Sequence, residues 1–158
     1  MKKGLFCLIM LLVAAVSFAT EDNGSISSHK AACPVCGMSV LMFADWNAEI
    51  TFADSTHAIF DGSKDMFKYY LDIKKYNPLK TNSDVAAITV KDYYAKTSID
   101  ALKAYFVIWG DVYGPMGHEP VPFEKEADAN KFLKEHKGRK IVKFAEITPK
   151  LLHELDNP

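Results

Sequence analysis

The sequence has few cysteines, no excess of positive charge, and a single long apolar run, at its start. Its 158 residues contain 3 cysteines, and 19 lysines and arginines stand against 20 acidic residues. Because no basic patch or stripe is present, we do not expect a nucleic-acid partner. The hydrophobic fraction of 49% and the charged fraction of 25% are those of an ordinary soluble globular domain.

The first 19 residues have the pattern of a secretory signal peptide. Lys2 and Lys3 give a positive start, residues 5–16 form an apolar run that is short for a membrane span, and residues 17–19 suit cleavage. We therefore expect an exported, periplasmic protein with no stable membrane insertion after signal cleavage. The alternative is an anchor formed by an uncleaved N-terminal helix. The expected cleavage site has no lipoprotein cysteine, since Cys7 lies inside the apolar run.

The mature chain begins with a polar, Gly/Ser-rich stretch at residues 20–30, which we interpret as a flexible tether. A first series of elements follows it. The expected elements are strands at residues 48–53 and 57–60, a helix at 63–72 capped by Asp61 or Ser63, a strand at 85–91 and a short helical tail at 99–103.

The same series is predicted a second time. Its expected elements are strands at residues 104–109 and 119–123, a helix at 127–136 ended by Gly138, a strand at 140–144 and a helical tail at 149–155. The sequence therefore predicts an α+β fold of two similar ββαβ subdomains packed together, with mainly antiparallel sheets. They would cover residues 31–103 and 104–158. Met42 and Met66 lie in apolar segments and are expected in the core.

Residues 33–38 (CPVCGM) are the first candidate site. A close cysteine pair in an exported protein forms a small disulfide loop, a redox centre or a metal site. Cys36 and Met38 are two residues apart, so in an extended backbone a thiolate and a thioether face the same side and reach one ion together. This soft pair of ligands selects Cu(I) over hard cations. Cys33 is either a further ligand or a disulfide partner of Cys36.

Residues 114–118 (GPMGH) are the second candidate site. Two glycines and a proline predict a tight loop that presents Met116. Taken alone, Met116 would more often fill a gap in a hairpin. Together with Cys36 and Met38 it supplies the third soft ligand of a Cu(I) site. His118 either completes the set through a neutral imidazole or has a structural role.

Two other functions compete with copper binding. A thiol–disulfide oxidoreductase would use Cys33 and Cys36, but its first cysteine sits at a helix N-terminus after a strand. Here a tether precedes the motif, and residues 39–43 after it are apolar and strand-like. A zinc-binding accessory protein would need four ligands, and no second Cys-x-x-Cys or His-x-x-x-His is present. Catalytic motifs of hydrolases are also missing, so we do not expect an enzyme.

The chain resembles the NosL family, which are periplasmic copper chaperones associated with nitrous oxide reductase. The resemblance extends over the mature chain and is most specific in CPVCGM (residues 33–38), in DMFKYY (residues 65–70) and in residues 90–123. It implies two ββαβ subdomains, and Cu(I) ligands at Cys36, Met38 and Met116. It also implies delivery of copper to the catalytic copper site of nitrous oxide reductase, with a membrane copper-transport complex as a further partner.

Overall fold

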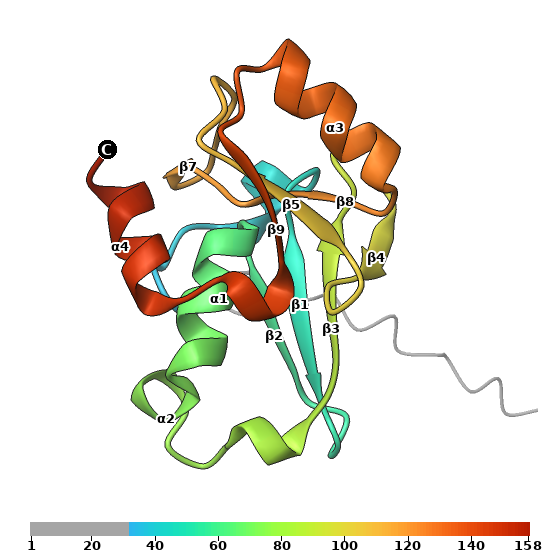
Figure 1. Ribbon diagram of the computed structural model, residues 1–158. Coiled ribbons are helices and arrows are strands. Elements are labelled where there is room, and N and C mark those ends of the chain that lie inside the picture. Colours follow the sequence, from blue (N-terminus) through green and yellow to red (C-terminus); the bar gives the residue numbers. More distant parts are fainter. Residues whose placement is uncertain (1–31) are drawn as a thin grey trace, which may run out of the picture.

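Two antiparallel sheets and a separate hairpin form the β-structure of this computed structural model, which describes residues 32–158 (Figure 1). The first sheet has the strand order β2-β1-β3-β4, the second has the order β8-β5-β9, and β6 pairs with β7. The strands are β1 (Ala48–Phe52), β2 (His57–Phe60), β3 (Val85–Lys91), β4 (Ser98–Asp100), β5 (Tyr105–Ile108), β6 (Tyr113–Gly114), β7 (Gly117–His118), β8 (Val121–Phe123) and β9 (Lys140–Lys143).

Within residues 32–158 four α-helices accompany the sheets, and the predicted α+β fold with antiparallel sheets is confirmed. The helices are α1 (Ser63–Leu71), α2 (Ile73–Tyr76), α3 (Glu126–Glu135) and α4 (Pro149–Asp156). The order β1-β2-α1-β3 recurs as β5-β8-α3-β9, and in both sheets the first of these strands lies between the other two. The signal peptide, the alternative N-terminal anchor and the tether fall in residues 1–31, outside the described residues. Within residues 32–158, no helix is long and apolar enough to cross a membrane.

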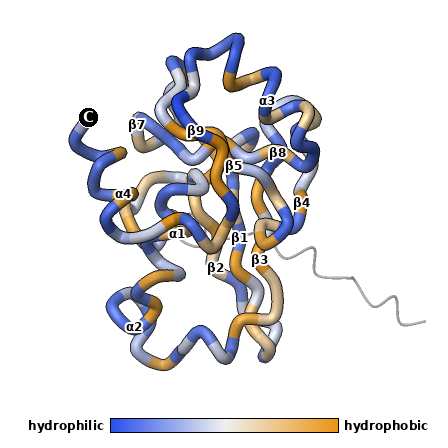
Figure 2. Tube along the Cα trace, in the orientation of Figure 1, coloured by the Kyte–Doolittle hydropathy of each residue, from blue (hydrophilic) through white to orange (hydrophobic). Residues whose placement is uncertain are grey.

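Alternating burial explains the strands, and aromatic side chains join the two units. Along β1, Ala48, Ile50 and Phe52 are buried while the residues between them are partly exposed, as expected for a half-buried strand. The hydrophobic colours of β5 in Figure 2 agree with its largely buried sequence, YFVI. The ring of Phe67 on α1 lies 5.2 Å from that of Phe106 on β5, so helix and strand from different units share one core.

Five local predictions are wrong. Residues 39–43 are not strand-like, because Val40–Phe43 forms a 3₁₀ helix that leaves Met42 75% exposed and outside the core. The tail expected at 99–103 is instead the edge strand β4 followed by a turn. Gly62, without a side chain, is the N-cap of α1, so neither Asp61 nor Ser63 caps it.

The fifth error concerns the end of α3. Lys137, not Gly138, adopts the left-handed conformation there, with φ of 54°. The Gly138 N–H then donates to the Leu133 carbonyl, which corresponds to the 6→1 bond of a Schellman motif. Only glycine fits at position 138, because a Cβ there would lie 2.6 Å from a methyl carbon of Val107.

Candidate metal centre

The CPVCGM segment is a small loop closed by its own backbone. The Cys33 N–H donates to the Met38 carbonyl at 2.8 Å, and the Gly37 N–H donates to the Cys33 carbonyl at 2.9 Å. Gly37 adopts a φ of +79°, in the left-handed region that favours glycine. The extended backbone expected between Cys36 and Met38 is therefore absent. The loop turns its two thiols inward, toward the start of α1.

Each thiol meets a carboxylate at the N-terminal end of α1. The Cys33 thiol donates to Oδ2 of Asp65, and the Cys36 thiol donates to Oδ2 of Asp61, each at 3.4 Å. One donor atom from each of these four residues lies within 4.8 Å of every other. Both aspartates and Cys33 are buried, whereas Cys36 is partly exposed and so reachable from solvent. Both cysteines are free thiols, and the structure places two sulfur and two oxygen donors in one cluster.

Burial favours the protonated forms of the two thiols and of Asp65. Desolvation raises the pKa of the Cys33 thiol to about 11, and burial together with the nearby Asp65 carboxylate raises the pKa of Cys36 still further. Desolvation, reinforced by the charge of Asp61, also raises the pKa of Asp65. A redox cysteine needs a lowered thiol pKa, so this environment argues against the oxidoreductase hypothesis. A metal ion that binds here must displace thiol protons.

The second candidate segment is the tip of the β6–β7 hairpin. Both backbone groups of Met116 are held: its N–H donates to Oε1 of Glu119 at 3.2 Å, and its carbonyl accepts from the Lys64 ammonium. Gly114 is required by close packing, since a Cβ there would lie 2.4 Å from Cγ of Glu119 and 3.1 Å from the Trp46 ring. The hairpin is thus fixed on the first turn of α1.

Glu119 replaces the capping side chain that Gly62 cannot supply. Its Oε2 accepts from the backbone N–H of Lys64 at 2.7 Å and from the Ser63 hydroxyl at 3.2 Å, which satisfies donors left free at a helix start. Complete burial raises the pKa of this carboxyl to about 7. One side chain therefore caps α1 and positions the Met116 backbone.

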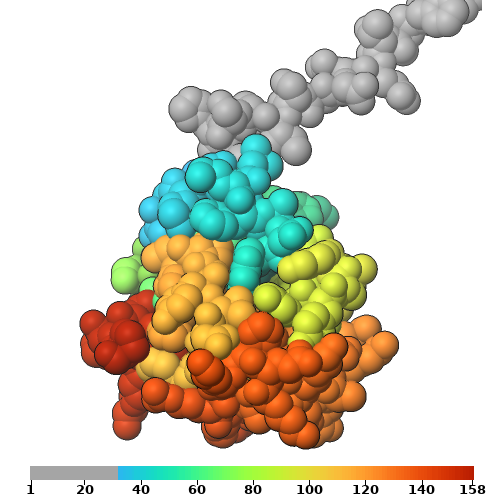
Figure 3. Space-filling model, turned by 90° about the horizontal axis from the view of Figure 1, so that it is seen from above, coloured from blue at the N-terminus to red at the C-terminus, as the bar shows by residue number. Residues whose placement is uncertain are grey.

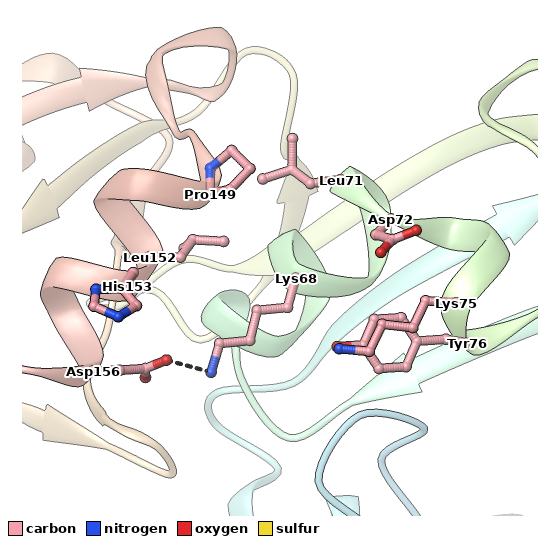
Figure 4. Close-up of a pocket in the computed structure, with 9 residues that line it drawn as sticks. All are labelled: Lys68, Leu71, Asp72, Lys75, Tyr76, Pro149, Leu152, His153 and Asp156. Carbon is pink, nitrogen blue, oxygen red and sulfur yellow. Dashed lines mark ion pairs between the residues drawn. The ribbon is translucent and has the colours of Figure 1, made fainter.

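The C-terminal helix completes the surroundings of α1. The Lys64 side chain is fully buried, and its ammonium pairs with Oδ1 of Asp156 at 2.9 Å. Lys68, one turn further along α1, pairs with Oδ2 of the same carboxylate at 2.8 Å (Figure 4). Burial raises the pKa of Asp156, but the two ammonium groups outweigh that effect and the net shift is downward. The buried Lys64 ammonium thus links α4 to the Met116 loop.

His118 lies beside Met116 with one ring nitrogen unpaired. Its ring packs at 4.7 Å from that of Tyr113 and at 5.4 Å from that of Trp109. Nδ1 is buried and has no hydrogen-bond partner among the described residues. Buried polar atoms without a partner are uncommon and frequently mark functional sites. His118 therefore remains a candidate ligand.

The two candidate segments are neighbours at the surface. Figure 3 shows residues near 40–47, in cyan, directly against residues near 110–117, in gold. Within these segments Gly114 packs so closely that a Cβ there would lie 3.1 Å from the Trp46 ring. Cys33 and Cys36 are brought together, and the Met116 loop contacts Lys64, the neighbour of Asp65. That the sulfur atoms of Cys36, Met38 and Met116 converge on one ion stays a prediction.

Four residues of this site were missed by the sequence interpretation: Asp61, Lys64, Asp65 and Glu119. Asp61 was taken for a cap, Asp65 was part of a family motif without a role, and Glu119 was assigned only to a strand. Asp61 lies 25 residues from Cys36, Asp65 lies 32 residues from Cys33, and Glu119 lies 55 residues from Lys64. No local pattern carries such distant contacts, so only the fold reveals them.

Comparison with known proteins gave one family and related structures. The family model described as NosL matches residues 25–152. The crystal structure of the copper chaperone NosL from Shewanella denitrificans is similar, with 24% identity and a TM-score of 0.62 over 75% of this chain and 90% of that one, which supports the fold. The solution NMR structure of apo-NosL from Achromobacter cycloclastes has 25% identity and a TM-score of 0.46, over 66% of this chain and 87% of that one. A search of curated proteins found no match.

Proposed function

The chain belongs to the NosL family, and from this we propose that it is a periplasmic Cu(I)-binding metallochaperone that delivers copper to the catalytic copper site of nitrous oxide reductase. The related structure from Shewanella denitrificans is that of a copper chaperone. In this proposal the protein is not an enzyme, because copper moves by ligand exchange. Export of the chain to the periplasm follows from its signal-like N-terminus.

One observation carries the proposal: the two sulfur-bearing loops bind adjacent residues on the first turn of α1. The thiol loop contacts Asp65, and the Met116 loop contacts Lys64. Two soft-ligand segments that are far apart in sequence are therefore fixed close together before an ion binds. Such preorganisation lowers the entropy cost of assembling a site.

We propose Cys36, Met38 and Met116 as the Cu(I) ligands, with Cys33 or His118 as a further one. All of these except Cys33 are partly exposed, so a partner's ligand can approach the ion as it leaves. Thioethers are uncharged and carry no proton, which suits a site that must bind Cu(I) and still release it. The unpaired Nδ1 of His118 supports its inclusion as a candidate.

Exposed apolar side chains on the same two segments suit a protein partner. Leu41 and Met42, close after the thiol loop, are 69% and 75% exposed, and Tyr113 on the hairpin is 65% exposed. Apolar side chains grouped beside a functional site are typical of an interaction surface. We propose that nitrous oxide reductase or a membrane copper-transport complex docks here during transfer.

An anaerobic Cu(I) titration of the reduced protein against a competing chelator tests the proposed ligands. Met38→Ala and Met116→Ala should each weaken Cu(I) binding at least about tenfold, because each removes one soft ligand. Met42→Ala is the matched control: it removes an exposed thioether four residues after Met38 and should leave Cu(I) affinity unchanged. If neither ligand variant differs from wild type, the proposed ligand set is wrong.

Delivery is tested separately, with copper-free nitrous oxide reductase as acceptor. The Cu(I)-loaded protein is expected to activate the reductase, either directly or when membranes with the transport complex are added. The double variant Leu41→Ser/Met42→Ser should bind Cu(I) normally but transfer it more slowly. Equal activation by free Cu(I) and by the loaded protein would contradict a delivery role.

A further inference from the structure

We propose that the cleft between α1, α2 and α4 is a docking site for a partner's peptide segment that carries one carboxylate between aliphatic side chains. The cleft has a volume of about 380 Å³, which is in the range of binding pockets, and it is open to solvent (Figure 4). Its walls are the end of α1, the short helix α2 and one side of α4. None of the proposed copper ligands lines it, so the inference goes beyond the site of the proposed function.

The apolar walls of the cleft suit aliphatic side chains. Leu71 at the end of α1 lies opposite Pro149 and Leu152 on α4, and Tyr76 lines the side formed by α2 (Figure 4). Leu71 is 38% exposed, so a ligand that covers it removes apolar surface from water, which is favourable. Because the cleft is open, a peptide can continue past it while its apolar side chains lie between the helices, as in other helix-lined grooves.

The charges in the cleft favour an anionic group on the segment. The polar and charged side chains that line it are Lys68, Asp72, Lys75, His153 and Asp156. Asp156 is already paired twice, with Lys68 at 2.8 Å and with the buried Lys64 behind it at 2.9 Å. When Lys64 is counted, three ammonium groups stand against two carboxylates, an excess of one positive charge. Lys75, which lies over the Tyr76 ring at 5.0 Å, is thus available to form a charge-assisted hydrogen bond with a carboxylate of the segment.

The cleft is linked to the Met116 loop through Asp156 and Lys64. The Lys64 ammonium pairs with Asp156 and also donates to the Met116 carbonyl. A carboxylate that pairs with Lys68 from the cleft competes with Asp156 for that lysine. The Asp156 carboxylate then binds Lys64 more strongly, and the Met116 carbonyl loses part of its hydrogen bond. Docking should therefore loosen the Met116 loop and weaken Cu(I) binding, a consequence that rests on the proposed function because it needs Met116 as a ligand.

An NMR titration of the isotope-labelled, copper-free full chain with the peptide acetyl-Leu-Glu-Leu-amide tests the docking site. We expect saturable chemical-shift changes in residues 68–76 and 149–156, which form the cleft. The uncharged peptide acetyl-Leu-Gln-Leu-amide should bind about fivefold more weakly, and Lys75→Glu should weaken binding of the acidic peptide at least as much. Lys74→Glu is the matched control, because Lys74 is on the same helix but does not line the cleft, and it should bind as wild type does.

Three results would overturn the docking site: no saturable change at millimolar acidic peptide, equal binding of the two peptides, or unchanged binding by Lys75→Glu. Hexanoate is a further arm of the titration. If hexanoate binds as tightly as the acidic peptide, the cleft is a site for a small carboxylate and the proposed peptide partner is wrong.

The link to the Met116 loop is tested by chelator competition for Cu(I) with and without saturating acidic peptide. The peptide should lower the Cu(I) affinity of wild type at least about fivefold. An unchanged Cu(I) affinity would refute the link. The peptide titration uses copper-free protein, so its outcome is separable from the proposed function. Peptide binding by a protein that does not bind Cu(I) would refute the copper proposal alone, and Cu(I) binding without peptide binding would refute the docking site alone.

Discussion

The two ββαβ units place helices α1 and α3 at equivalent positions, but the helices begin in opposite environments. At the start of α1, Asp61, Ser63, Lys64 and Asp65 are each at most 1% exposed. At the start of α3, Glu124, Lys125 and Glu126 are exposed. Each helix begins three residues after a fully buried phenylalanine, Phe60 or Phe123. The difference in exposure therefore does not arise from the position of each helix relative to the strand before it.

What differs is the chain that covers each helix start. Residues 32–47 and the chain around the β6–β7 hairpin bring two thiols, a buried glutamate and the Met116 loop to the start of α1. The segment before α3 is held instead by one carboxylate, since the Glu124 N–H donates to Asp92 at 2.8 Å. The repeated fold thus supplies two equivalent scaffolds, and the added segments turn one of them into a site.

The largest expected difference between the two helix starts is in stability. Glu119→Ala removes the carboxylate that caps α1 and leaves the buried Lys64 ammonium less well compensated, so it should cost about 3–5 kcal/mol of unfolding free energy. Glu124→Ala, at the exposed start of α3, should cost less than about 0.5 kcal/mol. Urea denaturation followed by circular dichroism measures both. Similar losses of unfolding free energy in the two variants would contradict the expected difference between the two helix starts.

The link between α4 and α1 should have a smaller effect that depends on pH. Asp156→Asn should lower the unfolding free energy by about 1–3 kcal/mol near neutral pH, because it leaves the buried Lys64 without its carboxylate partner. The pKa of Asp156 lies below its usual 3.8 in the folded protein, so this stabilisation is present above that pH and is lost as the pH falls through the lowered value.

Denaturation of wild type and Asp156→Asn between pH 7 and pH 2 checks this sign. The gap in stability between the two proteins should narrow on acidification below about pH 4. Glu154→Gln is the control on the same helix, because the pair that Glu154 makes with Lys150 at 3.9 Å is exposed. A gap that widens in acid would show that Asp156 does not stabilise α1 through its charge.

The two thiols beside the start of α1 should make the Cu(I) affinity depend on pH. Burial raises the pKa of Cys33 to about 11, and the pKa of Cys36 is raised as well, so both thiols are protonated at neutral pH. Each thiol that binds copper must then lose one proton. The Cu(I) affinity should therefore rise about tenfold per pH unit for each such thiol. Competition titrations at pH 6, 7 and 8 give this slope.

The slope also separates the two roles open to Cys33. A tenfold change per pH unit indicates that Cys36 alone is a ligand, and a hundredfold change indicates both thiols. Cys33→Ala should leave a tenfold slope unchanged in the first case and reduce a hundredfold slope to tenfold in the second. An affinity independent of pH would exclude a protonated thiol as a ligand.

The exposed surface beside the site should affect stability least. Leu41→Ser/Met42→Ser removes side chains that are 69% and 75% exposed, so its unfolding free energy should stay within about 0.5 kcal/mol of wild type. Thermal unfolding measures this, and the transfer assay with nitrous oxide reductase measures the separate effect on delivery. A large loss of stability would show that these side chains support the thiol loop instead.

The sequence predicted the repeated elements well and the site only in part. Strands such as β1 and β3 were predictable because their alternating apolar residues are local patterns. Helices α1, α3 and α4 were predicted within one residue of their ends, whereas the short helix α2 was not predicted. The shape of the CPVCGM loop was not predictable from the sequence, because it depends on a positive φ at Gly37 and on two backbone hydrogen bonds that close the loop. The cap of α1 by Glu119 depends on residues 55 positions apart, a separation that no local pattern encodes.

X-ray absorption spectroscopy at the copper edge tests most directly whether sulfur from both loops binds one ion. Wild-type protein loaded with one Cu(I) should have about three sulfur neighbours per copper, and Met116→Ala should have about two. A Met42→Ala control should keep all three. An unchanged sulfur count in Met116→Ala would contradict the account, because the hairpin loop would then contribute no ligand.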